Sequence, residues 1–103
     1  MSSEMFETLE EELQSVLDVV DKRIDTRLMG SAYGESRKKV VNEIERDLSE
    51  AQSLLQQLES EARLAPQPYR LELTSKIRGH RENVGRTNAR YRNVLADFSS
   101  NGR

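Results

Sequence analysis

The residue types that most often carry catalysis are scarce in this sequence. It has one histidine, His80, and no cysteine, which excludes histidine clusters and Cys–His nucleophilic pairs. Carboxylates are abundant, but pairs such as Glu43 with Asp47 lie among polar residues that would not raise a pKa for acid–base work. The Gly-rich loops that cradle phosphate groups are also missing. We therefore expect no enzyme, no metal site and no cofactor, and we interpret the carboxylates as solvated helix faces.

The single histidine allows two interpretations. His80 falls on an apolar stripe, where a partly buried histidine with satisfied polar atoms is the common case. The sharper alternative is a histidine that makes the fold sensitive to pH. We predict the first.

One flank of the last third of the chain is basic. Arg70, Arg78, Arg81 and Arg92 fall within about 80° of arc on a helix. Such a stripe can bind phosphate groups, but acidic residues elsewhere in a small domain can also pair with it. No aromatic residues interleave with it, as a binder of single-stranded nucleic acid would require. We therefore predict pairing between helices and no nucleic-acid partner.

Two places carry side chains suited to an interface. Tyr69 and Arg70 follow Pro68 in a proline-rich corner, and tyrosine and arginine are enriched at binding hot spots. Val19 lies off the apolar stripe of the first segment, among polar residues. The alternative for Tyr69 is that it caps the end of the core.

Three apolar stripes must position these side chains. Their steps alternate between three and four residues, which is typical of a helix and not of a strand. The first stripe contains Phe6, Leu9, Leu13, Val16, Val20 and Ile24, with Leu17 and Leu28 beside it. The second contains Val41, Ile44, Leu48, Ala51, Leu55, Leu58 and Ala62. The third contains Leu73, Ile77, His80, Val84, Thr87, Tyr91, Val94 and Phe98.

The spacing predicts helices over about 4–29, 35–64 and 68–98. A glycine-containing turn separates the first two, and two prolines one residue apart end the second, because proline cannot continue a helix. The third is the weakest by propensity, since Gly79 and Gly85 each cost about 1 kcal/mol relative to alanine.

Short connections make sequential helices antiparallel neighbours. The predicted fold class is therefore all-α: an antiparallel, up-down-up, left-handed three-helix bundle over residues 1–98, with 99–103 as a flexible tail. Hydrophobic residues make up 35% and charged residues 33% of the 103, which suits one domain of amphipathic helices rather than a membrane-spanning protein.

Charge is divided unevenly along the chain. Residues 1–65 hold 15 acidic and 8 basic side chains, and residues 66–103 hold 3 acidic and 8 basic ones. Opposite charges of this kind predict segments that attract one another on folding, or two separate partner surfaces.

An ordered set of short motifs runs along the second segment. They are Arg37–Lys39, Glu43 and Glu45, Glu50-Ala51, Leu54-Leu55, Glu61 with Arg63, and Pro66–Arg70. This set resembles the amino-terminal domain of the Vti-type vesicle SNAREs, the Qb-SNAREs of trans-Golgi and endosomal traffic. The resemblance covers nearly all of residues 3–98. Two departures are Leu58, where the family usually has methionine, and His80, where it usually has an aromatic residue.

The resemblance implies a three-helix, Habc-type regulatory domain on the cytoplasmic face of trans-Golgi, endosomal or vacuolar/lysosomal membranes. Its implied partners are proteins: the ENTH domain of an epsin-related clathrin adaptor, other SNAREs or tethers. A complete family member continues into a SNARE helix and a membrane anchor, so membrane contact is expected only through segments beyond these residues. We expect the domain itself to be monomeric.

The resemblance also implies an adaptor-facing surface. Carried over residue by residue, it consists of Pro68, Tyr69 and Arg70, with Asp18, Val19 and Lys22 as a weaker second part.

Three alternatives stay open at this point. A spectrin-like structural spacer has the same architecture, but such repeats usually carry a tryptophan that this chain lacks. An autoinhibitory bundle would fold onto its own SNARE helix through an apolar groove, for which Leu17, Val40 and Leu54 are the candidates. A basic arm that binds RNA is the third, and steep salt dependence of binding would support it.

Overall fold

The computed structural model describes residues 4–28 and 34–101, with side chains as far as residue 97. All regular structure in these ranges is helical, which confirms the predicted all-α class. Helix α1 spans Glu4–Arg23 and passes into a short π-helix, η1, at Ile24–Leu28. Helix α2 spans Glu35–Leu64, and helix α3 spans Gln67–Asn101.

The end of α1 differs from the uninterrupted helix that the spacing predicted over 4–29. The hydroxyl of Thr26 donates to the carbonyl of Lys22 at 2.7 Å, and side-chain bonds of this kind compete with the regular helix ladder. The chain nevertheless keeps Ile24 and Leu28 fully buried, so the wider turn continues the apolar stripe. Residue 29 and most of the predicted glycine turn lie outside the described residues.

The bounds of α2 agree with the predicted range 35–64. Gly34 precedes the helix with φ at +84°, and its carbonyl accepts the N–H of Lys38 at 3.2 Å. At the other end Ala65 is extended, as the residue before a proline usually is.

The bounds of α3 differ from the predicted 68–98. The helix begins one residue early, at Gln67, because the N–H of Tyr69 donates to the carbonyl of Pro66 at 2.9 Å. It continues to Asn101, since no proline or glycine intervenes between Gly85 and that residue.

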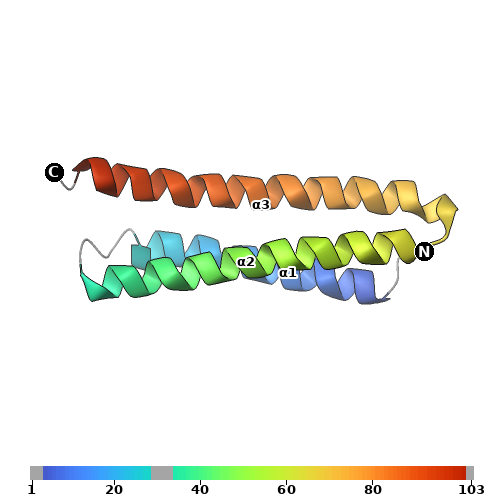
Figure 1. Ribbon diagram of the computed structural model, residues 1–103, viewed down its shortest axis with the longest axis horizontal. Helices are drawn as coiled ribbons and strands as arrows, with labels where there is room; N and C mark the ends of the chain where they lie inside the picture. The colour runs from blue at the N-terminus through green and yellow to red at the C-terminus, as the bar shows by residue number, and fades with distance from the viewer. Residues whose placement is uncertain (1–3, 29–33, 102–103) are drawn as a thin grey trace.

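The three helices form a rod of 55 × 19 × 16 Å. Figure 1 shows that α1 and α3 run in one direction and α2 in the other, which is the predicted up-down-up order. Helix α2 packs against both neighbours, whereas α1 and α3 approach one another least.

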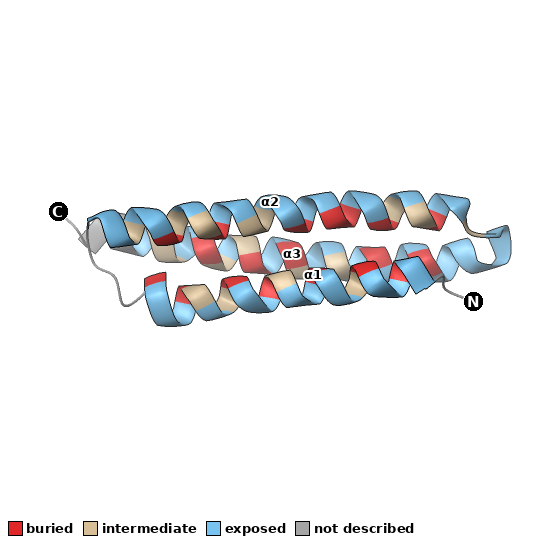
Figure 2. Cartoon of the chain, turned by 90° about the horizontal axis from the view of Figure 1, so that it is seen from below, coloured by how far each residue is buried: buried red, intermediate tan, exposed pale blue. Residues whose placement is uncertain are grey.

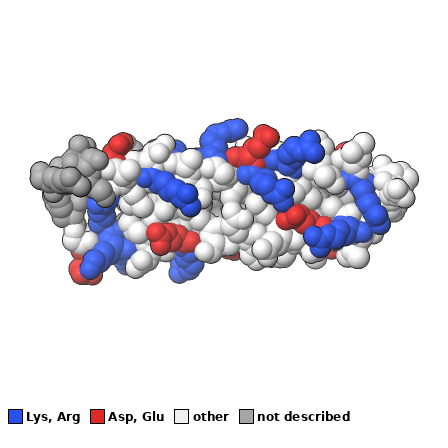
Figure 3. Space-filling model, turned by 45° about the horizontal axis from the view of Figure 1, so that its top comes forward, with Lys and Arg blue, Asp and Glu red and all other residues white. Residues whose placement is uncertain are grey.

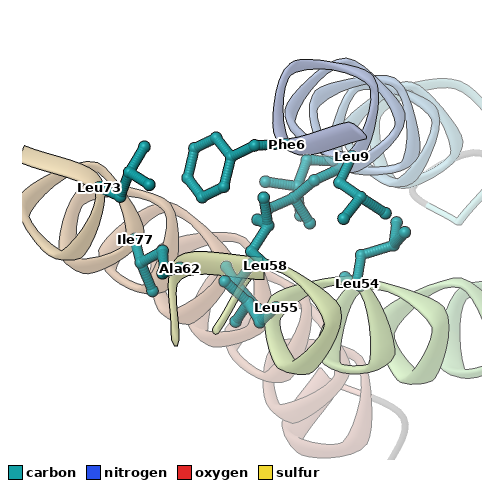
Figure 4. Close-up of a cluster of buried hydrophobic side chains, with 12 residues drawn as sticks. Phe6, Leu9, Leu54, Leu55, Leu58, Ala62, Leu73 and Ile77 are labelled. Carbon is teal, nitrogen blue, oxygen red and sulfur yellow. The ribbon is translucent and has the colours of Figure 1, made fainter. Parts of the chain in front are cut away.

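Buried residues line the inner faces of the helices in two clusters along the rod (Figure 2). The first cluster lies at the end where α2 turns into α3, and Figure 4 shows Phe6 of α1 facing Leu73 of α3 there, with Leu58 of α2 between the helices. The second, smaller cluster contains Val20, Ile24, Leu28, Val40, Ile44 and Tyr91.

The core is wider than the predicted stripes. Leu17, Val40 and Leu54 are buried, whereas Val16, Val41 and Leu48 are only partly buried. A helix that packs against two neighbours buries a broader face than a strict heptad seam, so positions beside the seam enter the core. The suggestion that Leu17, Val40 and Leu54 line an outer groove is therefore wrong.

The two polar residues of the third stripe, His80 and Thr87, are partly and almost fully buried, respectively. Nε2 of His80 donates to a carboxylate oxygen of Glu10 at 2.6 Å, and the side chain is partly buried. This confirms the prediction of a satisfied histidine at the edge of the core. Thr87 is 8% exposed and separates Val84 of the first cluster from Tyr91 of the second.

Ion pairs join all three pairs of helices. Arg23 pairs with Asp47 between α1 and α2, and Arg81 lies 3.0 Å from Glu59 between α3 and α2. Arg90 of α3 pairs with two carboxylates near the end of α1, Asp21 at 3.0 Å and Asp25. The uneven charge of the chain thus serves in part to attract the helices to one another.

Candidate partner-binding surface

The corner between α2 and α3 is built by two prolines and closed by hydrogen bonds. The N–H of Ala65 donates to the carbonyl of Ala62 at 3.2 Å, and Nε of Arg70 donates to the carbonyl of Ala65 at 2.9 Å. Proline fixes one backbone angle at both Pro66 and Pro68. The corner therefore holds the first turn of α3 in a fixed position relative to the end of α2.

Three large apolar side chains are exposed around this corner. Tyr69 is 39% exposed, and Leu64 and Leu71 are 79% and 82% exposed. Tyr69 lies one turn before the buried Leu73, on the same side of α3, and remains exposed. Tyr69 is the aromatic side chain among them, the type enriched at binding hot spots.

Leu64 and Leu71 are not among the interface residues that the sequence predicts. Neither fits the three-and-four spacing of its helix, but this signal alone does not identify exposed residues, because Leu17 and Leu54 also lie off the stripes and are buried. Leu71 lies two residues beyond Tyr69, so the two side chains point to different sides of α3.

The second predicted part of the surface lies on α1. Val19 is 42% exposed and borders a shallow hollow of about 200 Å³ between α1 and α2. Asp18 and Lys22 are exposed beside it, and Asp18 accepts a hydrogen bond from Gln14 at 2.9 Å.

The structure does not bring the two parts of the predicted surface together. Pro68, Tyr69 and Arg70 lie at one end of the rod. Near that end Phe6 of α1 faces Leu73 of α3 (Figure 4), and Val19 is thirteen residues further along α1. At ~1.5 Å per residue, Tyr69 and Val19 are about 25 Å apart along the bundle. A partner anchored at the corner would have to extend along α1 to reach Val19.

The comparison with protein families decides what kind of domain this is. A family model described as "Vesicle transport v-SNARE protein N-terminus" matches residues 1–95. The chain belongs to this family. No solved structure matches the v-SNARE domain at a significant level.

Membership gives this v-SNARE amino-terminal domain a role in vesicle transport, within a non-enzymatic family whose partners are proteins such as other SNAREs. In the described ranges no three His, Asp or Glu side chains are grouped as a metal site. None of the helices described is both long and apolar enough to cross a bilayer. Membership favours the trafficking role over the structural spacer.

The pKa of the Tyr91 phenol in the v-SNARE domain is raised above its ordinary value. Burial raises the pKa of the Tyr91 phenol, and its hydrogen bond to Glu45 at 2.9 Å raises it further. The folded state therefore favours the neutral phenol, whereas the unfolded chain ionises near the ordinary value of about 10.

We expect Tyr91→Phe to remove a pH dependence of stability. The contribution of the neutral phenol to the free energy of unfolding is complete below about pH 10. It is lost as the pH rises further, because the unfolded chain releases the phenol proton at a lower pH than the folded protein does. Urea unfolding of both proteins from about pH 8 to pH 11 measures this, and the wild type should lose stability more steeply. Parallel curves for the two proteins would contradict the assignment.

Proposed function

We propose that this domain is the Habc-type regulatory domain of a Vti-type SNARE in trans-Golgi and endosomal traffic. In this role it works on the cytoplasmic face of trans-Golgi, endosomal or vacuolar/lysosomal membranes. It binds the ENTH domain of an epsin-related clathrin adaptor and so sorts the SNARE as cargo. Family membership supports the trafficking role, and the residue pattern of residues 37–70 supports the Vti-type branch.

The observation that carries the adaptor proposal is the corner itself. Tyr69 combines a fixed backbone with a half-exposed ring, and Arg70 is held beside it by its bond to the carbonyl of Ala65. An anchor of this kind loses little conformational freedom on binding, which is what aromatic hot spots at interfaces exploit. The polar surroundings provide the charged rim of a modest interface.

The autoinhibitory alternative has lost its main support. It needed an apolar groove on the outside of the bundle, and its candidates Leu17, Val40 and Leu54 are buried in the core. Regulation of SNARE assembly through the corner stays compatible with the proposal.

We expect Tyr69→Ala to weaken adaptor binding at least about tenfold, because truncation of a hot-spot aromatic costs more than about 1 kcal/mol. The helical melting transition should stay largely unchanged, since Tyr69 is exposed and belongs to neither buried cluster. Isothermal titration calorimetry with the purified ENTH domain measures the affinity, and circular dichroism measures the melting.

Two matched variants sharpen this experiment. Tyr69→Phe keeps the ring and should keep most of the affinity, which separates apolar contact from the hydroxyl. Val19→Ala tests whether the partner extends along α1. The proposal fails if the folded wild-type domain shows no saturable binding, or if Tyr69→Ala lowers stability by several kcal/mol without a specific loss of binding.

A further inference from the structure

A second hollow lies beside the corner, in the groove between the end of α2 and the start of α3. Its volume is about 310 Å³. Ala62 and Ile77, which are 6% and 5% exposed, form part of its lining together with Thr74. The floor of this groove is therefore apolar.

The rim of the groove is built from arginines. Arg81 is engaged, 3.0 Å from Glu59, and Nε of Arg70 donates to a backbone carbonyl of the corner. Arg63 and Arg78 also line the groove and are exposed, and neither forms an ion pair within the described part of the chain. Lys and Arg side chains predominate on the face that α3 presents in Figure 3.

The predicted pairing between helices is thus incomplete on this flank. It accounts for Arg81, but it leaves Arg63 and Arg78 as like charges on opposite sides of one groove. Neither guanidinium group is neutralised by an ion pair within the described part of the chain, so a ligand carboxylate in the groove can pair with either of them and accept bidentate hydrogen bonds.

We propose that this groove binds an acidic peptide segment, with carboxylates on Arg63 and Arg78 and an apolar side chain on the floor formed by Ala62 and Ile77. The recognition is by charge complementarity at the rim and by burial of apolar surface below it. The groove and the corner share Arg70, but the two arginines that would bind the carboxylates, Arg63 and Arg78, lie outside the predicted corner surface.

The groove favours a peptide over a polyphosphate headgroup. Glu59 in the lining pairs with Arg81 and so reduces the positive charge available to a compact polyanion, whereas a peptide needs only one carboxylate for each of Arg63 and Arg78. The apolar floor offers nothing to a phosphate. Leu71, which is 82% exposed, lies seven residues before Arg78 on the same side of α3 and adds apolar contact for a peptide.

The groove is separate from the Tyr69 anchor. Tyr69 is not part of the lining, and its nine-residue separation from Arg78 places the two about 180° apart around α3. Tyr69→Ala should therefore leave peptide affinity unchanged, and failure of one proposal leaves the other standing.

The test measures fluorescence anisotropy of a labelled synthetic peptide in which glutamates alternate with leucines. Arg78→Glu should raise its Kd at least about tenfold, because reversal of one charge of a close pair costs more than about 1.4 kcal/mol. Arg63→Glu, on the other helix, should give a similar loss. Circular dichroism confirms that each variant folds, as expected for exposed positions.

The matched control is Arg86→Glu, which makes the same charge change on the same helix. Arg86 is exposed and lies nine residues after Ile77, on the side of α3 opposite the groove floor. Its Kd should change by less than about threefold at about 0.15 M salt, where charges beyond ~8 Å are screened.

Several results would overturn the proposal. They are no saturable binding by the folded wild-type domain, equal losses for Arg78→Glu and Arg86→Glu, or equal binding of a peptide that contains glutamate without leucine. Binding of phosphoinositide-containing vesicles that Arg78→Glu abolishes, without peptide binding, would assign the groove to a lipid headgroup instead.

Discussion

Replacing Leu58 by alanine is expected to lower the free energy of unfolding by about 3 kcal/mol, within the 2–5 kcal/mol typical of buried leucines. Leu58 is 0% exposed and lies between the three helices in the larger cluster. Its removal leaves a cavity that all three helices line, and helices fixed at a rigid corner cannot easily collapse into it. Urea unfolding followed by circular dichroism measures the loss.

The matched control is Leu64→Ala, the same substitution six residues later on α2. Leu64 is 79% exposed, so the expected change is less than about 0.5 kcal/mol. Similar losses at the two positions would mean that α2 is not packed as described.

The double substitution of Gly79→Ala and Gly85→Ala should raise the free energy of unfolding by about 1–2 kcal/mol, whereas Leu58→Ala lowers it. Both glycines are exposed within α3, and an added Cβ would meet no atom within 4 Å at either site. Alanine restricts the unfolded chain more than glycine does and adds no clash. The same unfolding measurement tests it, and a loss of stability would mean that a neighbour packs closely there.

Gly34→Ala provides the control for this reasoning. The space around Gly34 is equally open, but its φ is +84°, in the left-handed region that favours glycine. We expect this variant to lose about 1 kcal/mol, so the same substitution changes sign with backbone conformation alone.

Much of the fold could be predicted because strong local signals bracket the helices. The predicted range of α2, about 35–64, agrees with its bounds, since Gly34 precedes the helix and Pro66 follows within two residues of its end. The apolar spacing could not show how many neighbours each helix has. For that reason the sequence predicts Leu17 beside the apolar stripe and Leu54 as a candidate for an outer groove, whereas both are buried in the core.

The candidate site was only partly predictable. The residue types at Tyr69 and Arg70 predict an interface at the corner, but the exposed fraction of Tyr69 depends on tertiary packing that the spacing does not give. The basic flank of α3 was visible in the sequence. The sequence did not show which of these arginines forms an ion pair. Arg81 lies opposite Glu59 across the groove, whereas Arg78 forms no ion pair with any residue that the structure describes.

The ion pairs between the helices have a consequence for alignment. A heptad pattern repeats itself every seven residues, so apolar contacts alone would tolerate a slide of one helix by a whole repeat. Such a slide of α2 would place Val40 or Leu54 where Asp47 now meets Arg23. A slide of α1 in one direction would likewise set Leu17 against His80 in place of Glu10. Each shifted arrangement leaves a partly buried charge without its partner, so the polar pairs select one register among those that the core would accept.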